Sequence, residues 1–381
     1  MNFLAFLILF SVQVQAEVSI QGPGLGNQIT LSDANIYNYR SIHIISRRYD
    51  QGDEMQPEVI FEIPEGEIAW SKTIELQKGA GQYQFDIQGQ VDHHSEFQKL
   101  GHFSFQNVMV AKNFQSAQNF ADLSGRSLPD VELLLLQVKK NGGDPTATSN
   151  YFIRNPKQAW SLRVFAREGS GQYEIKLAAT SRHEIEMGHL THTLGTYTLA
   201  MHPTSAATLL ASGMAQSDQP EILALARLIT ATAKTKYEKT SLIHDWVALN
   251  IAYEPEMLAI DSRATNILKT DALSVLNLKK TICTGYANLT AALLRAVGVD
   301  TRIINGTVSA SDGHVLGLHA WNEAYVDDRW LILDTTWDSG YVVNDPATKH
   351  LVFSPNFRRE YFDAKPKDFE LHHTAQKIRN D

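Results

Sequence analysis

The sequence has very little cysteine: one residue, Cys283, in a chain of 381. A lone cysteine has no partner within the chain for a disulfide, so a covalently cross-linked fold is excluded, as is a zinc site built on a CxxC pair. Basic runs are also missing and the net charge is −8, which argues against nucleic acid as a partner. The chain further lacks a phosphate-binding loop and a dinucleotide fingerprint, and we therefore expect no cofactor.

Long hydrophobic runs are scarce, and the one near the N-terminus is too short to cross a bilayer. Residues 3–10 are mostly apolar, and residues 14–16 offer a cleavage site before Glu17, as in a secretory signal peptide. No Lys or Arg precedes the apolar stretch, so a buried N-terminal strand is the alternative. We expect residues 1–16 to be a signal peptide. The protein would then be exported (periplasmic, cell-surface or secreted), without stable membrane insertion after cleavage.

The first 200 residues contain an internal repeat. The Ala-Trp-Ser of residues 69–71 recurs at 159–161, and segment 79–87 recurs at 169–177, each ninety residues later. In both copies apolar and polar residues alternate after a Gly-x-Gly turn, which is typical of a half-buried strand. A repeat of this length predicts two tandem all-β Ig-like sandwich domains. Their expected bounds are residues 17–112 and 113–204.

The pattern changes near residue 205, where helical spacing replaces alternation. Pro220 is suited to the first position of a helix, and apolar residues then recur three and four apart. Further helices are expected at residues 239–251, 271–276 and from 283 to 298, and strands at 301–304, 320–326 and 330–333. Helices followed by strands predict an α+β third domain over residues 205–381.

Cys283 is predicted to lie at the start of a buried helix that Gly298 terminates. At a helix N-terminus, the dipole and the free amide groups favour a thiolate over a thiol. The alternative is that Cys283 is a small buried apolar residue, as free cysteines often are. The residues that come after it along the chain decide between the two.

A histidine and an aspartate follow on a predicted hairpin. His319 begins one strand and Asp334 follows the return strand, with a turn at residues 327–329. The two positions are unequal distances from the turn, so a bulge or a diagonal reach is needed for them to meet. An aspartate on one imidazole nitrogen would orient the other toward a thiol. Taken singly, the histidine could be a surface residue and the aspartate a cap.

The third domain resembles the transglutaminase-like superfamily, whose core has a papain-like Cys-His-Asp arrangement, and in particular its bacterial exported branch. The resemblance covers about residues 210–375 and implies that Cys283 is the nucleophile, His319 the base and Asp334 the orienting carboxylate. Thr284 departs from the acidic or bulkier residue expected after the cysteine, which leaves substrate choice open. The motifs that carry the resemblance are at 216–218, 220–222, 237–239, 243–247, 250–253, 283–287, 294–298, 319–323 and 334–338.

An oxyanion formed at Cys283 would need hydrogen-bond donors, and the backbone N–H of the cysteine is the natural first one. Tyr253 and Trp246 are candidates for the second, although Trp246 fits better as a packing residue of its helix. Trp321 is expected either to line an acyl-donor groove, together with Trp330 and Trp337, or to pack around the hairpin. Thr284 is expected to shape the substrate pocket.

A histidine-rich stretch in the second repeat is the one candidate metal site: His183, Glu184, Glu186, His189, His192 and His202. No pair of these histidines has the spacing of a helical metal site, so a solvated polar face is the better interpretation and no metal is predicted. The pair His372-His373 is interpreted in the same way.

These observations favour an exported thiol enzyme that acts on amide bonds through an acyl-thioester. Its expected partner is a protein or peptide substrate, including cell-wall peptides, and the reaction is either transglutaminase-like acyl transfer or hydrolysis as a cysteine peptidase or amidase. The alternative is a non-catalytic adhesion or scaffold protein that carries a relic of the third domain.

Overall fold

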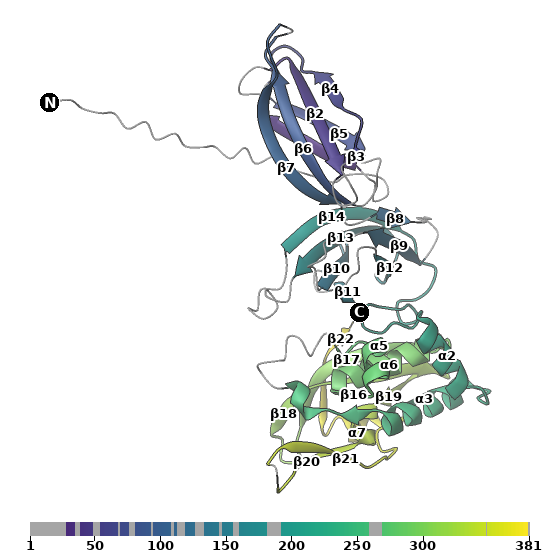
Figure 1. Ribbon diagram of the computed structural model, residues 1–381. Coiled ribbons are helices and arrows are strands. Elements are labelled where there is room, and N and C mark those ends of the chain that lie inside the picture. The colour runs from purple at the N-terminus through teal and green to yellow at the C-terminus, as the bar shows by residue number, and fades with distance from the viewer. Residues whose placement is uncertain are drawn as a thin grey trace, which may run out of the picture. The chain divides into compact units, whose positions relative to one another are not determined.

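The computed structural model describes residues 28–34, 39–48, 54–67, 69–75, 81–92, 94–107, 110–112, 119–125, 133–144, 147–154, 160–180, 192–258, 269–347 and 349–379 (Figure 1). The expected signal peptide lies outside these residues. Within them, no helix combines the length and the apolar character needed to span a membrane. The chain divides into two compact units, one ending near Ala111 and the other holding most of the remaining residues. The division into domains at 112 and 204 stays a prediction.

The first unit is built of strands, as the alternation predicts. One sheet has the order β3-β2-β6-β7 with β4 beside β2, and β1 pairs with β5 in a second. The strands are β1 (Gln28–Ala34), β2 (Ser41–Arg48), β3 (Glu54–Met55), β4 (Val59–Glu62), β5 (Ala69–Glu75), β6 (Gly81–Gln90) and β7 (Gln98–Asn107). Apolar residues at alternate positions of β2 and β6, such as Ile44 and Phe85, form its core.

The second repeat, together with residues 110–112 just before it, forms two sheets, with the orders β11-β10-β13-β14 and β12-β9-β8. The strands are β8 (Val110–Lys112), β9 (Phe120–Gly125), β10 (Leu133–Lys140), β11 (Ser149–Arg154), β12 (Trp160–Phe165), β13 (Gly171–Thr180) and β14 (His192–Met201). Matching residues of the two repeats occupy matching places: Trp70 and Trp160 are buried on β5 and β12, and Tyr83 and Tyr173 on β6 and β13. The residues that repeat in the sequence therefore include aromatic side chains that are buried at matching positions of the two repeats.

The C-terminal part contains a sheet of the order β19-β18-β17-β22, with helix α6 packed on β17 and β18. The helices are α2 (Pro220–Ile229), α3 (Lys236–Asn250), α5 (Ala272–Leu278), α6 (Cys283–Ala296), α7 (Thr335–Ser339) and α8 (Pro366–Phe369), with a 3-10 turn η1 (Pro255–Leu258). The sheet strands are β17 (Asp300–Ser309), β18 (Val315–Val326), β19 (Arg329–Leu333) and β22 (His373–Arg379). Two short pairs complete it: β15 (Ala252–Tyr253) with β16 (Lys280–Thr281), and β20 (Gly340–Asn344) with β21 (Leu351–Pro355).

Helix α6 is the centre of this domain because almost every one of its residues is buried. Its apolar side chains pack against α2, α3 and α5 on one side and the sheet on the other. Gly285 is required here, since a Cβ at that position would lie 2.0 Å from the Thr281 hydroxyl oxygen. Asn322 of β18 donates to the Ala287 carbonyl at 3.0 Å and ties the helix to the sheet. The start of α6 is thereby fixed relative to β18.

Two helix starts differ from the sequence prediction. Helix α3 begins at Lys236 rather than 239, because Thr235 and Glu238 form a reciprocal capping box in front of it. Helix α7 was not predicted; Asp334 caps it by accepting from the backbone N–H groups of Thr336 and Trp337. This second cap fixes the position of one residue of the predicted Cys-His-Asp arrangement.

Candidate active site

Cys283 is the first residue of α6, as its sequence context predicts. The residue before it, Ile282, makes no side-chain cap, and no acidic residue occurs in the first turn. The positive end of the helix dipole therefore has no carboxylate of its own helix to balance it. The thiol is buried but not sealed, with 9% of the residue exposed.

His319 and Asp334 meet by a diagonal reach rather than through a bulge. Strands β18 and β19 pair without a register shift from Asn322–Leu333 to Val326–Arg329. Asp334 thus lies just past the end of β19, where the chain turns into α7, and its Oδ2 is 2.7 Å from His319 Nε2. The sequence left open whether a bulge or a diagonal reach brings the two residues together. The position of Asp334 as the cap of α7 provides the diagonal reach.

The charges of the three side chains support one another. Burial alone would raise the pKa of Cys283, but hydrogen bonds from His319 and from the Ala320 backbone N–H outweigh it and lower that pKa. Burial would lower the pKa of His319, yet Asp334 and the thiolate raise it to about 10. His319 in turn holds the pKa of the buried Asp334 well below its usual range. Near neutral pH, this arrangement favours a thiolate–imidazolium pair.

A fourth residue, His373, belongs to this network and was missed by the sequence analysis. Its Nε2 lies 3.1 Å from Asp334 Oδ2, and its ring is fully enclosed. The interpretation of His372-His373 as a bland polar pair is therefore wrong for His373. Nothing local in the sequence reveals its place, because the pairing of β22 with β17 brings it there.

The same residues offer the one candidate set of metal ligands within the described part of the chain. Ligand atoms of His319, Asp334 and His373 lie within 4.8 Å of one another. Zinc bound at about 2.0–2.2 Å from each ligand would hold those atoms roughly 3.3 Å apart, wider than the 2.7 Å of the first pair. The contacts of Asp334 with His319 and His373 have the lengths of hydrogen bonds, and we assign them as hydrogen bonds. Residues 183–189 of the histidine-rich stretch lie outside the described residues.

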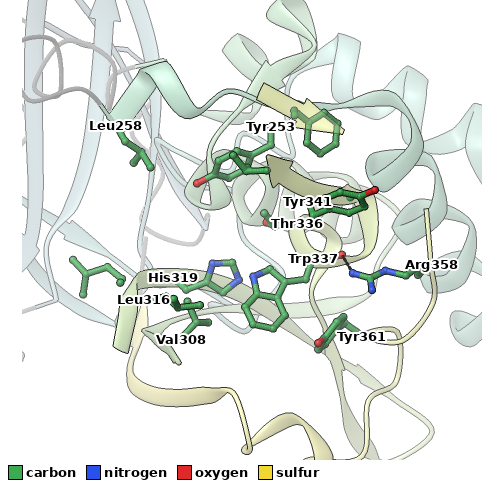
Figure 2. A pocket seen from close by; sticks show the side chains of 15 residues that line it. Tyr253, Leu258, Val308, Leu316, His319, Thr336, Trp337, Tyr341, Arg358 and Tyr361 are labelled. Atoms are coloured by element: carbon green, nitrogen blue, oxygen red, sulfur yellow. Dashed lines mark hydrogen bonds between the residues drawn. The ribbon is translucent and has the colours of Figure 1, made fainter. Parts of the chain in front are cut away.

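A cavity of about 750 Å³ opens beside His319 (Figure 2). Its walls come from β18, α7, η1 and the hairpin β20–β21, and are mainly apolar and aromatic. The lining residues are Tyr253, Leu258, Val308, Leu316, Gly317, Leu318, His319, Thr336, Trp337, Gly340, Tyr341, Val342, Phe353, Arg358 and Tyr361. An apolar cavity lined by His319 is suited to hold an organic substrate against the imidazole; Cys283 itself is not one of its lining residues.

The remaining candidate residues are distributed around this site. Tyr253 lines the cavity, and the parallel pairing of β15 with β16 places it beside the segment that leads into Cys283. Burial raises the pKa of Tyr253, and the nearby Cys283 and Asp334 raise it further, so its hydroxyl stays protonated as a donor. Thr284 is half-buried in the first turn of α6 and does not line the cavity.

The tryptophans divide between packing and the cavity. Trp321 is buried against Phe369 beneath the site, while Trp337 lines the cavity. Trp246 packs against the core next to α6, with the Lys279 ammonium 4.9 Å from its ring centre. Tyr253 is therefore the better placed of the two candidate second donors.

Comparison with known proteins bears on the part of the chain that carries the site. The family model of the transglutaminase-like superfamily matches residues 223–335. The kyphoscoliosis peptidase of Mus musculus is 32% identical over 135 residues, which is 32% of this chain and 19% of that protein. The chain therefore matches about a fifth of the length of this curated relative.

Two solved structures show weaker likeness. One, from Cytophaga hutchinsonii and described as a candidate cysteine protease, has 18% identity and a TM-score of 0.30 over 63% of this chain and 77% of that one. A TGase crystal structure has 20% identity and a TM-score of 0.25 over 34% of each chain. The resemblance inferred from the motifs is confirmed by the family match: residues 223–335, which contain Cys283, His319 and Asp334, are a transglutaminase-like domain.

Proposed function

We propose that this protein is an exported thiol enzyme that attacks amide bonds of proteins or peptides, cell-wall peptides among them, through Cys283. The observation that carries the proposal is the 2.7 Å contact of His319 with Asp334 beside Cys283, an arrangement in which His319 lowers the pKa of the thiol against the effect of its burial. A buried structural cysteine gains nothing from a lowered pKa, whereas a nucleophile depends on it.

In the first step, the thiolate attacks the amide carbonyl carbon and forms a C–S bond. The negative charge that develops on the carbonyl oxygen is stabilised by the Cys283 backbone N–H at the start of α6 and by the Tyr253 hydroxyl. The C–N bond then breaks, and the leaving amine takes the proton of the His319 imidazolium. An acyl-thioester remains on the enzyme.

In the second step, His319 acts as the base. It removes a proton from water or from an amine, whose oxygen or nitrogen attacks the thioester carbonyl while the sulfur leaves as thiolate. Water gives a carboxylic acid and an amine gives a new amide bond. Asp334 holds the imidazole in one orientation throughout, since its Oδ2 faces Nε2 and leaves the other ring nitrogen for the sulfur and the substrate.

The strand that carries His319 also offers a place for a peptide main chain. Strand β19 covers only residues 322–326 of β18, so no described strand pairs with that edge at residues 315–321. The Ala320 N–H faces the sulfur and therefore points to this open edge, and alternation along the strand directs the backbone groups of Leu318 the same way. The alternation is interrupted at Leu316, where the register of β18 against β17 shifts. We infer that an extended substrate pairs with Leu318 at this edge.

A Leu318→Pro substitution tests this inference because it removes one N–H from the open edge. We expect KM for a peptide to rise several-fold, as the loss of one hydrogen bond of about 1 kcal/mol implies, with little change for a small activated ester. A KM for the peptide that equals that of the unsubstituted protein would contradict pairing at this edge. The Leu316 and Leu318 side chains, 61% and 71% exposed, suit apolar residues in such a peptide.

The two N-terminal repeats extend the proposal beyond the C-terminal domain. We propose that the strand-rich segments 17–112 and 113–204 are Ig-like sandwiches, supported by the two sheets in each and by the matching buried anchors. Export is supported by the signal-like pattern of residues 1–16. N-terminal sequencing of the protein recovered outside the cytoplasm tests export, and a mature protein that begins at Met1 would contradict it.

The reaction is tested by incubating the protein with a glutamine-containing protein and a primary amine, followed by mass spectrometry. Amine incorporation identifies acyl transfer, conversion of glutamine to glutamate identifies hydrolysis of the side-chain amide, and chain cleavage identifies a peptidase. Each activity should disappear in Cys283→Ala. The matched control is Thr284→Ala, which leaves the sulfur and its partners in place.

The competing hypothesis is a non-catalytic adhesion or scaffold protein. It predicts that iodoacetamide labels Cys283 no faster in the native protein than in the unfolded chain. Faster labelling of the native protein, slowed by His319→Ala, supports the enzyme instead.

A further inference from the structure

His373 lies where two strands of one sheet converge on a single carboxylate. It is the first residue of β22 and pairs with Val308 of β17, while His319 on β18 pairs with Gly306 of the same strand. The two histidines therefore approach Asp334 from either side of β17. A Cβ on Gly306 would lie 2.6 Å from the Trp321 ring, so this glycine leaves room for the indole, which packs beside both imidazoles.

The hydrogen bonds of Asp334 are completely assigned. Its Oδ1 accepts from the backbone N–H groups of Thr336 and Trp337 at 3.0 and 3.1 Å. Its Oδ2 accepts from His319 at 2.7 Å and from His373 at 3.1 Å. Asp334 is 0% exposed, so bulk solvent does not reach either oxygen. The two histidines compete for one oxygen atom.

The ring of His373 is held in one orientation. It stacks on Phe369 with ring centres 3.7 Å apart and an interplanar angle of 15°, and Trp337 lies 4.5 Å away on another side. Its Nδ1 is 3.3 Å from the Phe369 carbonyl oxygen. Both ring nitrogens thus face oxygen acceptors in a site that is 2% exposed. A ring fixed this firmly can present its Nε2–H to Asp334 continuously.

We propose that His373 is a positioning residue that holds the Asp334 carboxylate and weakens its hydrogen bond to His319 by sharing the same oxygen. The inference rests on the proposed function, because it concerns how the base of that reaction is tuned. A carboxylate oxygen that serves two donors binds each less strongly than one that serves a single donor. With His373 present, His319 remains oriented yet is able to release its proton to the leaving amine.

Removal of the second donor should therefore have two effects. Asp334 is less firmly held, which misplaces the imidazole and slows the reaction; a misplacement of this kind costs roughly tenfold or more in kcat. At the same time, Oδ2 is left to His319 alone, and His319 keeps its proton to higher pH. The alkaline limb of the pH–kcat/KM profile should move upward, which loss of packing alone does not produce.

The test compares His373→Leu, His373→Gln and the neighbouring control His372→Ala. Leucine keeps most of the volume without a donor, and glutamine places an amide N–H near the position of Nε2. His372 is half-buried and bonds to the Ser309 carbonyl instead of Asp334, so its loss should leave the profile unchanged. In His373→Leu we expect about a tenfold lower rate of thioester formation and an alkaline limb that is shifted to higher pH. His373→Gln should restore most of the rate and most of the original position of the limb.

Either of two results would overturn the inference: a His373→Leu profile equal to that of the unsubstituted protein, or a His373→Gln variant as slow as His373→Leu with an unmoved limb. If His373→Leu does not fold, His373→Gln decides alone. The alkaline limb of its pH–kcat/KM profile must then lie at the same pH as that of the unsubstituted protein. A native Cys283 that iodoacetamide labels no faster than the unfolded chain would instead contradict the proposed function, and the inference with it.

Discussion

Two buried histidines of the C-terminal domain each bond to an aspartate near the same short helix, and only one lies beside the cavity. His319 Nε2 is 2.7 Å from Asp334, the cap of α7, and His244 Nε2 is 3.0 Å from Asp338, inside α7. The difference is at the other nitrogen. That of His319 is left for Cys283, whose pKa His319 lowers, whereas Nδ1 of His244 faces a second carboxylate, Asp245, at 3.2 Å.

The comparison teaches that a buried His–Asp pair does not by itself indicate catalysis. His244 is enclosed by the rings of Phe357 and Phe362 and bridges α3 to α7. Burial alone would lower its pKa, but hydrogen bonds to Asp245 and Asp338 outweigh burial and raise it. A histidine held between two carboxylates is a fixed structural cation, whereas one between a carboxylate and a thiol can pass a proton to a substrate.

The largest expected effect comes from removing the thiol. Cys283→Ser should lower acyl transfer by at least about 10⁴-fold, because a serine hydroxyl is not ionised by an adjacent imidazolium. Amine incorporation followed by mass spectrometry measures this loss. Unfolding by urea should be nearly unchanged, since sulfur and oxygen fill similar space. Retention of more than a hundredth of the activity would indicate that another group is the nucleophile.

The next effect separates the two histidines by rate. His319→Ala should lower thioester formation by roughly 10³-fold, as the loss of a general base and of the thiolate's partner implies. His244→Ala should leave the rate per folded molecule within a few-fold, since His244 does not line the cavity. Circular dichroism gives the fraction of folded molecules in each variant. Equal losses of rate in His319→Ala and His244→Ala would contradict the different roles assigned to the two histidines.

Stability should show the opposite order. His244→Ala leaves Asp338 buried without its cation, and breaking such a pair costs about 3 kcal/mol in the free energy of unfolding. Because the pKa of His244 is raised on folding, its contribution is fully present below about pH 6.5 and is lost as pH rises through the raised value. Urea titrations across this range measure the difference between the variant and the unsubstituted protein. A difference that grows with pH would contradict the assignment of His244 as a buried cation.

The smallest expected effect sharpens the comparison at the two aspartates. Asp334→Asn removes the charge that raises the pKa of His319 to about 10, so the alkaline limb of kcat/KM should move down by about one pH unit or more. Asp338→Asn should leave that limb in place, because Asp338 bonds to His244 and not to His319. The pH–rate profiles of both variants, measured with one substrate, test this. A shift in both would mean that the two pairs are electrostatically one network.

Much of the site was predictable because it depends on short segments. Cys283 opens a helix whose apolar spacing and terminal glycine are visible in the sequence, and His319 and Asp334 flank a single hairpin. The two-residue turn of that hairpin, with Asp327 and Asp328 at positive φ, is also local. Chemistry and spacing thus pointed to three residues, and the resemblance to the transglutaminase-like superfamily implied their roles.

His373 could not be named because its place depends on a long-range pairing. It reaches Asp334 only after β22 joins the edge of the sheet next to β17, and its own sequence neighbours are polar. The hairpin β20–β21, which forms one wall of the cavity, was also missed. Its apolar side chains, such as Tyr341 and Val342, are partly exposed and give no core-like signal. Apolar patterns in a sequence indicate which residues are buried. Burial alone identifies neither His373 as a partner of Asp334 nor the hairpin β20–β21 as a wall of the cavity.

The central claim is that Cys283 is ionised in the native protein because His319 supplies its counter-charge. The most direct measurement is the rate at which iodoacetamide labels Cys283 as a function of pH, in the native protein and in His319→Ala. We predict fast labelling already well below about pH 8.5, the ordinary range of a free thiol, and a return toward that range in the variant. Native labelling that rises only near the ordinary thiol pKa, with no change in His319→Ala, would contradict the claim.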